Sequence, residues 1–444
     1  MITPAMLNAF QERFNADPVN SVVAGAIARV GINEASLDNT AIRVHDGVFS
    51  DITERGEITN QKSSGRCWMF AALNTLRVDV MRKLNLKTFE FSQNYMFFWD
   101  KLEKTNFFYN SILDTLDEPL NSRLVQHLLA APLGDGGQWA MFSGLLEKYG
   151  AVPKAFMPET FHSSNSGMMV YQLTYRLRAQ AKQLRDAHNA GAGKDELNKM
   201  KTEFLYDIYA ILVKALGQPP TRFTYTYRDK DDKFHRMSDI TPQEFFAQAV
   251  GWNLADKVSL INAPTADKPY GRVYTIKYLG SVAEAEIIKY INVPTEVIRE
   301  AAIAAIRDGE PVWFGCDVGK FLERSMGIMD LDIFNFEQTL GTIPEFDKAA
   351  RLDYGHSLLT HAMVFTGVDL DENGKPIKWQ VENSWGDQVG LKGMYSMADS
   401  WFDEYMYQIM IDRKYVPAEW LAALDQPIIE LEPWDPMGSL ANMR

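Results

Sequence analysis

Cys67 and Gln61 are the residues whose types and spacing best suit covalent chemistry. Cys67 is one of only 2 cysteines in a chain of 444 residues, and Gln61 lies shortly before it. A thiolate is a strong nucleophile. A glutamine amide can donate a hydrogen bond to the oxyanion that forms when a nucleophile attacks a carbonyl group. Together they indicate acyl transfer through a covalent intermediate on sulfur.

The residues that follow predict a helix beginning at or near Cys67. Gly65 is a helix breaker, whereas the run from Trp68 to Leu76 is rich in helix formers and apolar on all sides. The thiol would then face unpaired N–H groups and the positive end of the helix dipole. Both favour the thiolate, so we expect Cys67 to ionise readily.

A base for this thiol is predicted in the second half of the chain. The chain has 7 histidines, and His361 lies in an apolar, β-branched run that predicts a buried strand. A turn with Asn373-Gly374 at its centre follows, and then a second strand leads to Asn383. Such a hairpin would place the side-chain oxygen of Asn383 against one ring nitrogen of His361. The other ring nitrogen would face Cys67.

Four segments, in this chain order, resemble those of the papain-like cysteine peptidases. They are Gln61 with Ser64-Gly65-Arg66-Cys67-Trp68, the pair His361-Ala362, the run Glu382-Asn383-Ser384-Trp385-Gly386, and the run Gly390-Leu391-Lys392-Gly393-Met394-Tyr395. In that family a Cys-Gly-small-Cys-aromatic run surrounds the nucleophile. Ser64 replaces the first of these cysteines, which is a disulfide partner in the secreted enzymes, and this replacement indicates a reducing compartment.

Further matches resemble one branch of the family, the bleomycin hydrolases and bacterial aminopeptidases C. The chain between Cys67 and His361 is about twice as long as the roughly 130–150 residues of the short papain and cathepsin enzymes, so large insertions must lie there. The matching segments are residues 135–139 (Asp-Gly-Gly-Gln-Trp), 147–154 and 433–441. The resemblance runs from about Gly56 to the C-terminus.

The resemblance implies a catalytic role for four residues. Cys67 would be the nucleophile and His361 the acid and base. Asn383 would orient His361. The Gln61 side chain and the backbone N–H of Cys67 would form the oxyanion hole.

It also implies supporting roles. Trp385 would shield the hydrogen bond between His361 and Asn383 from water. Gly136 and Gly137 would let the substrate backbone approach closely, because glycine has no side chain. Cys316 is expected to be an ordinary buried residue, and His127 and His356 are expected to be core histidines. No cofactor is implied, and no Cys/His cluster has the spacing of a metal site.

The expected fold is α+β, a papain-like arrangement of a helical half and a β-rich half. Residues 1–55 form an N-terminal lead-in, residues 56–415 the papain-like catalytic core, and residues 416–444 a C-terminal arm. Within the core, residues 170–217 predict a helical hairpin around Gly191-Ala192-Gly193, which we expect to be an insertion. Four prolines after Tyr415 favour an extended arm over a packed element.

The family resemblance implies that the arm enters the active-site cleft and that its carboxylate pairs with the α-amino group of a peptide. The expected function is therefore that of a cytoplasmic cysteine aminopeptidase, with bleomycin hydrolase-like amidase activity also implied. Here Asn442-Met443-Arg444 extend past the usual end of the arm. Two alternatives stay open: a papain-like endopeptidase or acyltransferase with a displaced arm, and a non-catalytic oligomeric binding protein.

The composition limits the classes of partner that the protein can bind. The net charge of −13 argues against general affinity for nucleic acid, which needs a basic face. The start of the chain lacks the basic and apolar blocks of a secretory signal, and no run approaches the ~18 apolar residues of a membrane span. The lead-in is too short for an inhibitory propeptide, so we expect a closed homo-oligomer, which the resemblance implies to be a hexamer.

Overall fold

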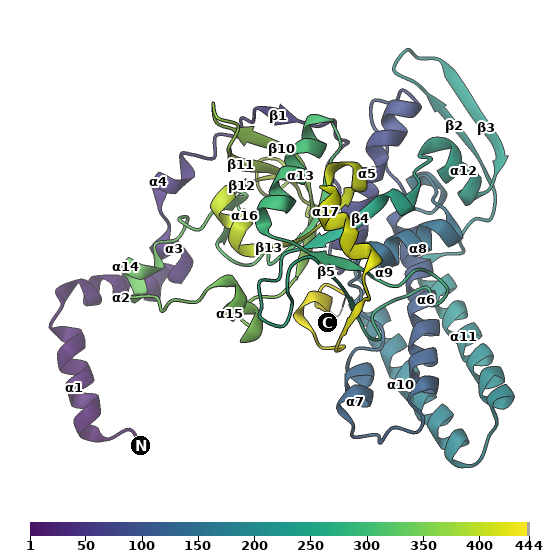
Figure 1. Ribbon diagram of the computed structural model, residues 1–444, viewed down its shortest axis with the longest axis horizontal. Helices are drawn as coiled ribbons and strands as arrows, with labels where there is room; N and C mark the ends of the chain where they lie inside the picture. Colours follow the sequence, from purple (N-terminus) through teal and green to yellow (C-terminus); the bar gives the residue numbers. More distant parts are fainter. Residues whose placement is uncertain (442–444) are drawn as a thin grey trace.

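The computed structural model describes residues 1–441 and has an α+β architecture in which one large sheet lies beside a bundle of helices (Figure 1). The sheet has 12 strands in the order β14-β5-β6-β4-β13-β7-β10-β11-β12-β9-β8, with β1 paired to β10. Its strands are β1 (Asp51–Ile52), β4 (Lys257–Ile261), β5 (Arg272–Ile276), β6 (Tyr290–Asn292), β7 (Val312–Cys316), β8 (Leu322–Glu323), β9 (Ile328–Met329), β10 (His361–Leu370), β11 (Pro376–Glu382), β12 (Met394–Ala398), β13 (Met406–Asp412) and β14 (Ile429–Leu431).

The helical half contains α5 (Cys67–Lys83), α6 (Gln93–Asp114), α7 (Arg123–Ala130) and α8 (Trp139–Tyr149). The predicted helix thus begins at Cys67 itself. Almost all of its first three turns is buried, because it lies between the helical half and the sheet. The indole of Trp313 on β7 donates to the carbonyl oxygen of Trp68, at 3.0 Å, and ties the start of α5 to the sheet.

The predicted hairpin of strands is formed by β10 and β11, which pair antiparallel from Val364↔Glu382 to Leu370↔Pro376. The strand β10 also pairs with β7, so that His361 lies opposite Cys316. Central strands such as β7 and β13 are buried almost throughout. The His361 end of β10 is therefore held by β7, and the Glu382 end of β11 lies between β10 and β12.

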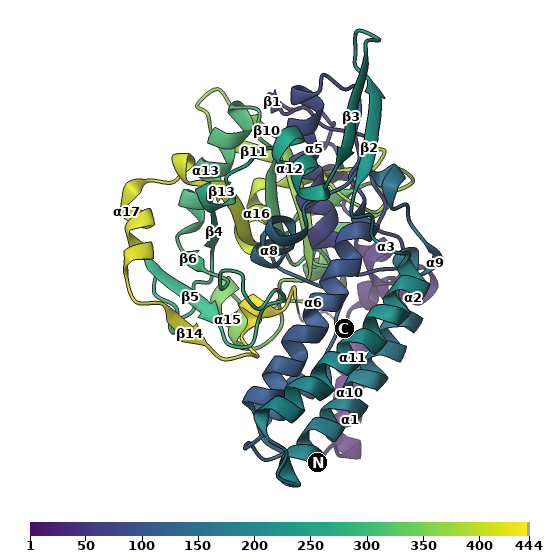
Figure 2. The same ribbon diagram turned by 90° about the vertical axis from the view of Figure 1, so that its right-hand side faces the viewer.

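The two helices predicted around residues 170–217 are α10 (Gly167–Asn189) and α11 (Lys194–Leu216), which follow the short α9 (Phe161–Ser164). They pack on α6 through one apolar stripe, and all three project together from the body (Figure 2). The hairpin of β2 (Phe223–Arg228) and β3 (Phe234–Ile240) and the helix α12 (Pro242–Ala249) lead back to the sheet. The outer helices of the sheet half are α13 (Thr295–Arg307), α14 (Phe336–Leu340), α15 (Lys348–Asp353) and α16 (Asp399–Tyr405).

The N-terminal residues form four helices, of which the first two extend away from the body (Figure 1) and the third packs beside α14. They are α1 (Pro4–Asn15), α2 (Pro18–Val30), α3 (Ile32–Ser36) and α4 (Asn39–Ile42). No residue of α1 or α2 is buried. Among residues 1–441, no helix combines the length and the hydropathy needed to cross a membrane.

The residues after β13 differ from the extended arm that the prolines predicted. They include the short helix α17 (Ala418–Leu421) and the strand β14, which pairs in parallel with β5 at the edge of the sheet. Further on, Met437 and Leu440 are buried. Proline spacing did not reveal this packing because an edge strand and a buried turn both tolerate neighbouring prolines.

Candidate active site

Cys67 is fully buried at the first position of α5. Burial raises the pKa of its thiol to about 11, although the backbone N–H groups of Ala362, Trp68 and Cys67 itself oppose the shift. The expectation that Cys67 ionises readily is therefore wrong for the thiol taken alone. The sequence indicated the helix terminus, but it could not indicate that the sulfur is removed from water.

His361 and Asn383 lie side by side, as the hairpin predicted. The Nε2 atom of the His361 ring is 2.9 Å from Oδ1 of Asn383. This contact leaves Nδ1 as the ring nitrogen that faces elsewhere. Cys67 lies against the same end of β10, because the backbone N–H of Ala362, the next residue after His361, acts on its thiol.

Burial also lowers the pKa of His361 to about 4, and the positive charge of Arg324 adds to this shift, while Asn383 opposes it. Each charge is thus disfavoured when it forms alone. Transfer of a proton from Cys67 to His361 would create both charges at once, and opposite charges that lie close together stabilise each other.

Gln61 is joined to the Asn383 segment by its side chain. Its Oε1 accepts a hydrogen bond from Oγ of Ser384 at 2.7 Å, and its Nε2 donates to the carbonyl oxygen of Ser64 at 2.7 Å. The backbone N–H of Gln61 donates to the carbonyl oxygen of Ser384. Ser384 therefore orients the amide, a role that sequence reasoning missed although Ser384 stands inside a recognised motif.

Trp385 covers the ring of His361. The two ring centres are 4.8 Å apart and their planes are inclined by 38°. The guanidinium of Arg324 lies 4.4 Å from the centre of the Trp385 ring. The structure thus places Trp385 against His361, where a shielding ring would have to lie.

Gly136 and Gly137 each lie in close contact with another part of the chain. A Cβ atom at Gly136 would collide with the carbonyl oxygen of Leu440, and one at Gly137 would collide with the indole of Trp68. Both positions require glycine for this reason. Leu440 and the helix that begins at Cys67 thus lie on either side of this glycine pair.

Two buried lysines of α6 hold the segment that leads to these glycines. Nζ of Lys104 donates to the carbonyl oxygen of Gly136 at 2.5 Å, and Nζ of Lys101 lies 2.9 Å from the Asp135 carboxylate. Burial lowers the pKa of Lys104 to about 8, although Asp100 opposes the shift. Burial alone would raise the pKa of Asp135, but the charge of Lys101 and the hydrogen bonds from Ser166, Lys101 and the backbone of Gly65 together lower it below its usual range.

Sequence reasoning missed these lysines because charged residues in a helix usually mark a solvated face. The sequence does contain one indication of their burial, because both lysines stand among the aromatic residues of α6. In the structure, Nζ of Lys101 lies 4.7 Å from the centre of the Phe97 ring.

The C-terminal residues lie along the same region. Oγ of Ser439 donates to the carbonyl oxygen of Leu359 at 2.8 Å, two residues before His361. Lys268 and Asp435, both largely buried, form an ion pair at 2.9 Å. Ala441 lines a cavity of about 120 Å³ together with Lys104 and Tyr278. Asn442-Met443-Arg444 lie outside the described residues.

A larger cavity of about 870 Å³ borders the loop before Cys67. It is lined by Ser64 and Gly65 on one side and by α10 on the other. Cys316 is buried, as expected. His356 is exposed, so its assignment to the core is wrong, and His127 is half-buried. His356 lies in the segment between α15 and β10, outside any helix or strand.

Comparison with known proteins agrees with the motifs. Aminopeptidase C of Streptococcus thermophilus is 47% identical over 437 residues, covering 98% of each protein, and bleomycin hydrolase of Rattus norvegicus is 40% identical, covering 98% of this chain and 97% of the relative. A crystal structure of PepW from Lactobacillus rhamnosis has a TM-score of 0.97 at 46% identity over 99% of both chains. The peptidase C1-like family matches residues 1–438. The resemblance predicted from the sequence is confirmed, and the chain belongs to the peptidase C1-like family.

Proposed function

We propose that this chain is a cysteine aminopeptidase that removes single residues from the N-terminus of peptides. The observation that carries the proposal is the contact of the chain end with the glycine segment of the site. The carbonyl oxygen of Leu440 lies where a Cβ of Gly136 would be, and Ser439 is hydrogen-bonded just before His361. A peptide that extended far beyond the scissile bond on its N-terminal side would need the same space.

The reaction uses a thioester. After the proton of Cys67 has moved to His361, the sulfur attacks the scissile carbonyl carbon and the carbonyl electron pair moves onto oxygen. The second N–H of the Gln61 amide and the backbone N–H of Cys67 stabilise this oxyanion. The oxyanion then collapses, the C–N bond breaks, and His361 gives its proton to the leaving amine. Water, deprotonated by His361, hydrolyses the thioester.

Asn383 holds His361 in the orientation that these steps need. Its Oδ1 accepts the hydrogen bond of Nε2, which leaves Nδ1 for the proton exchange with Cys67. Trp385 keeps water from this hydrogen bond and so strengthens it. We assign the catalytic role to Cys67 and His361, the orienting role to Asn383, and the oxyanion hole to Gln61.

We infer that the substrate amino group binds near residues 439–441. A carboxylate held near Gly136 would pair with the α-ammonium group of a peptide through a charge-assisted hydrogen bond. The cavity of about 870 Å³ beside Ser64 and Gly65 offers space for the side chain of the first residue, which favours broad specificity. Amides other than peptide bonds, as in bleomycin hydrolase activity, fit the same scheme because only the amino end is recognised.

The deciding experiment compares a free-amino aminoacyl-arylamide with its N-acetylated twin, using the Cys67→Ala variant as the control. Cleavage of the free-amino compound alone is expected. Cleavage of both compounds would replace the aminopeptidase by an endopeptidase whose chain end is displaced. Failure of the wild-type protein to cleave either compound would leave a non-catalytic binding protein.

We further infer that the protein is cytoplasmic and assembles into a closed homo-oligomer, a hexamer. The two cysteines are free, which suits a reducing compartment. Large apolar side chains of α1 are exposed: Met6, Leu7, Phe10 and Phe14. A helix with such a face and no buried residue needs a partner surface, and a second copy of the chain provides one.

A further inference from the structure

The loop that carries Gln61 toward Cys67 is closed by two reciprocal hydrogen bonds. Nε2 of Gln61 donates to the carbonyl oxygen of Ser64 at 2.7 Å, and Oγ of Ser64 donates to the carbonyl oxygen of Gln61 at 2.6 Å. Between them Lys62 has a positive φ of 53°, so the backbone turns tightly. The position of the Gln61 amide therefore depends on where Ser64 is held.

Ser64 is held by Arg66. The Arg66 side chain is fully buried, and its Nε donates to Oγ of Ser64 at 2.9 Å. Its guanidinium lies 5.0 Å from the ring centres of both Phe70 and Phe97. The two rings leave the guanidinium little freedom, and its planar fork fixes the direction of each N–H.

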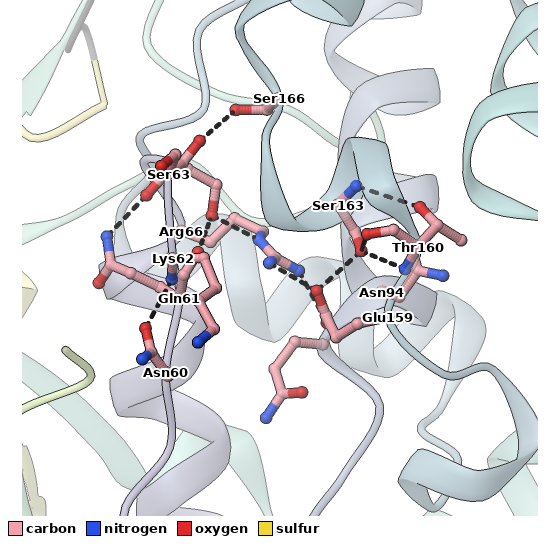
Figure 3. Close-up of polar contacts among 12 residues, drawn as sticks. Asn60, Gln61, Lys62, Ser63, Arg66, Asn94, Glu159, Thr160, Ser163 and Ser166 are labelled. Atoms are coloured by element: carbon pink, nitrogen blue, oxygen red, sulfur yellow. Dashed lines mark hydrogen bonds and ion pairs between the residues drawn. The ribbon is translucent and has the colours of Figure 1, made fainter. Parts of the chain in front are cut away.

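The other end of the guanidinium binds Glu159 in a bidentate pair. Nη1 is 3.0 Å from Oε1 of Glu159 and Nη2 is 2.7 Å from Oε2 (Figure 3). Oγ of Ser163 also donates to Oε2 of Glu159 at 2.7 Å. Bidentate pairs of this kind fix geometry as well as charge.

The segment around Glu159 is itself anchored to the helices. Nδ2 of Asn94 on α6 donates to the carbonyl oxygens of Pro158 and Leu216, each at 2.8 Å. The backbone N–H of Ser63 donates to the carbonyl oxygen of Ser164 at 3.0 Å. The segment before α10 and the loop at residues 61–66 therefore form one connected body (Figure 3).

Stability alone does not account for this pair. Removing two charges from water costs free energy that their attraction repays only in good geometry, and apolar residues of similar size often serve as well. What the pair provides is orientation. The hydrogen bonds from Glu159 fix Arg66, and the hydrogen bond from Arg66 fixes Ser64. We propose that Arg66 and Glu159 are positioning residues that hold the Gln61 amide at the oxyanion hole by way of Ser64.

The proposal rests on the proposed function only for the identity of the oxyanion hole. Its test uses two probes of Cys67 that differ in one respect. An amino aldehyde such as leucinal accepts the sulfur at its carbonyl carbon, and its oxygen then occupies the oxyanion hole. Iodoacetamide alkylates the sulfur by displacing iodide, so no oxyanion forms. A displaced Gln61 weakens the first reaction and spares the second.

The variants are Ser64→Ala, which removes one hydroxyl, and Glu159→Gln, which keeps the shape of the side chain and removes its charge. We expect leucinal to bind about 10- to 100-fold more weakly to each variant, because small displacements of an oxyanion donor have effects of this size. The iodoacetamide rate is expected to stay within about threefold of wild type. The kcat for the aminoacyl-arylamide should fall with the aldehyde affinity, whereas KM should change little.

A second measurement combines each variant with Gln61→Ala. If Ser64 and Glu159 act through Gln61, they should weaken leucinal binding by less than about threefold in the Gln61→Ala background, because interacting positions are non-additive. Arg299→Lys serves as the control, since this residue forms an ion pair with Asp399 on the far side of the sheet half. This variant should leave the leucinal affinity and the iodoacetamide rate unchanged.

Equal losses with both probes would overturn the proposal and show a general disturbance of the site. Undiminished leucinal binding by both variants would overturn it too, as would full multiplication of the effects with Gln61→Ala. If the wild-type protein binds leucinal but does not cleave the arylamide, the proposed function fails while the two-probe comparison still decides the role of Arg66 and Glu159. If Cys67 reacts with neither probe, both proposals fall.

Discussion

His361 is buried beside a buried thiol, and this shared burial governs how both residues respond to pH. Burial lowers the pKa of His361 to about 4, below the value near 6.5 of an exposed histidine. The folded state therefore binds this proton less readily than the unfolded chain. Between about pH 6.5 and 4 the unfolded chain takes up a proton that the folded protein refuses, so stability falls as the pH falls through that window.

The first prediction concerns this linkage. Glutamine is neutral at every pH, so the His361→Gln variant lacks this loss of stability. The stability advantage of wild type over the variant should shrink by about 3 kcal/mol from pH 7.5 to pH 4. Urea unfolding of both proteins across this range measures the difference. Parallel curves would show that His361 is not held neutral in the folded protein.

The second prediction concerns Asn383. Replacing it by alanine removes the acceptor that is 2.9 Å from Nε2 of His361. We expect kcat for the free-amino arylamide to fall about 100-fold, because the ring loses its orientation for proton transfer. Asn373→Ala, in the exposed turn of the same hairpin, should have no effect. Equal activity of the two variants would contradict the assigned role.

At the scale of residues, the sequence identified groups that lie in recognisable runs. Cys67, His361 and Asn383 each lie in or beside a run with a strong local pattern, and the structure brings all three to one place. The contacts of Ser384 with Gln61, of Arg66 with Glu159 and of Lys104 with Gly136 were not predicted, because each joins residues that are distant in sequence. A single serine or lysine has the same local appearance whether it is buried against a distant carbonyl group or faces water.

At the scale of elements, the helix α5 and the strand β11 are joined by a buried ion pair. Nη2 of Arg77 is 2.6 Å from Oε1 of Glu382, and both side chains are almost fully buried. Glu382 immediately precedes Asn383. The helix that begins at Cys67 is thus tied directly to the last residue of the strand that leads to Asn383.

The third prediction tests this pair. Arg77→Met should cost about 3–5 kcal/mol of unfolding free energy, because it leaves Glu382 buried without its partner. Burial already raises the pKa of Glu382, so the variant should be more destabilised at pH 8 than at pH 5, where the carboxyl group is neutralised more easily. The double variant Arg77→Met/Glu382→Leu should recover most of the loss. A cost below about 1 kcal/mol in urea unfolding would contradict the argument.

The fourth prediction concerns the chain end. A protein that ends at Glu432 lacks Leu440, which lies against Gly136, and Ser439, which is hydrogen-bonded to Leu359 just before His361. We expect it to gain cleavage of the N-acetylated arylamide and to lose its preference for the free-amino compound, because the space on the N-terminal side of the scissile bond opens. A protein lacking only residues 442–444 is the matched control. Unchanged selectivity in the shorter protein would mean that another segment excludes blocked substrates.

Elements with a strong period were the easiest to predict. The helices from 167 to 189 and from 194 to 216, and the hairpin of β10 and β11, lie where apolar spacing and turn residues placed them. The strand β14 was not predicted, since it is only 3 residues long and its partner β5 lies far away in the sequence. Pairings of that kind depend on the assembled sheet.

At the scale of the whole molecule, the N-terminal helices extend away from the body and expose apolar side chains (Figure 1). The fifth prediction follows from this arrangement. Light scattering should give the wild-type protein a mass several times the 50.4 kDa of one chain. The double variant Phe10→Glu/Phe14→Glu should shift the mass downward, because it places charges on the apolar face of α1. Glu12→Lys on the same helix is the control, and a monomeric wild-type protein would refute the inferred assembly.

The order of the site residues along the chain has a consequence during synthesis. Cys67 is made well before His361 and Asn383, and the three residues meet only when β10 and β11 join the sheet beside α5. At translation rates of about 5–20 residues per second, roughly 15–60 s pass between the thiol and its base. A ribosome-bound chain that has not yet reached His361 therefore carries Cys67 without the histidine that we propose as its base.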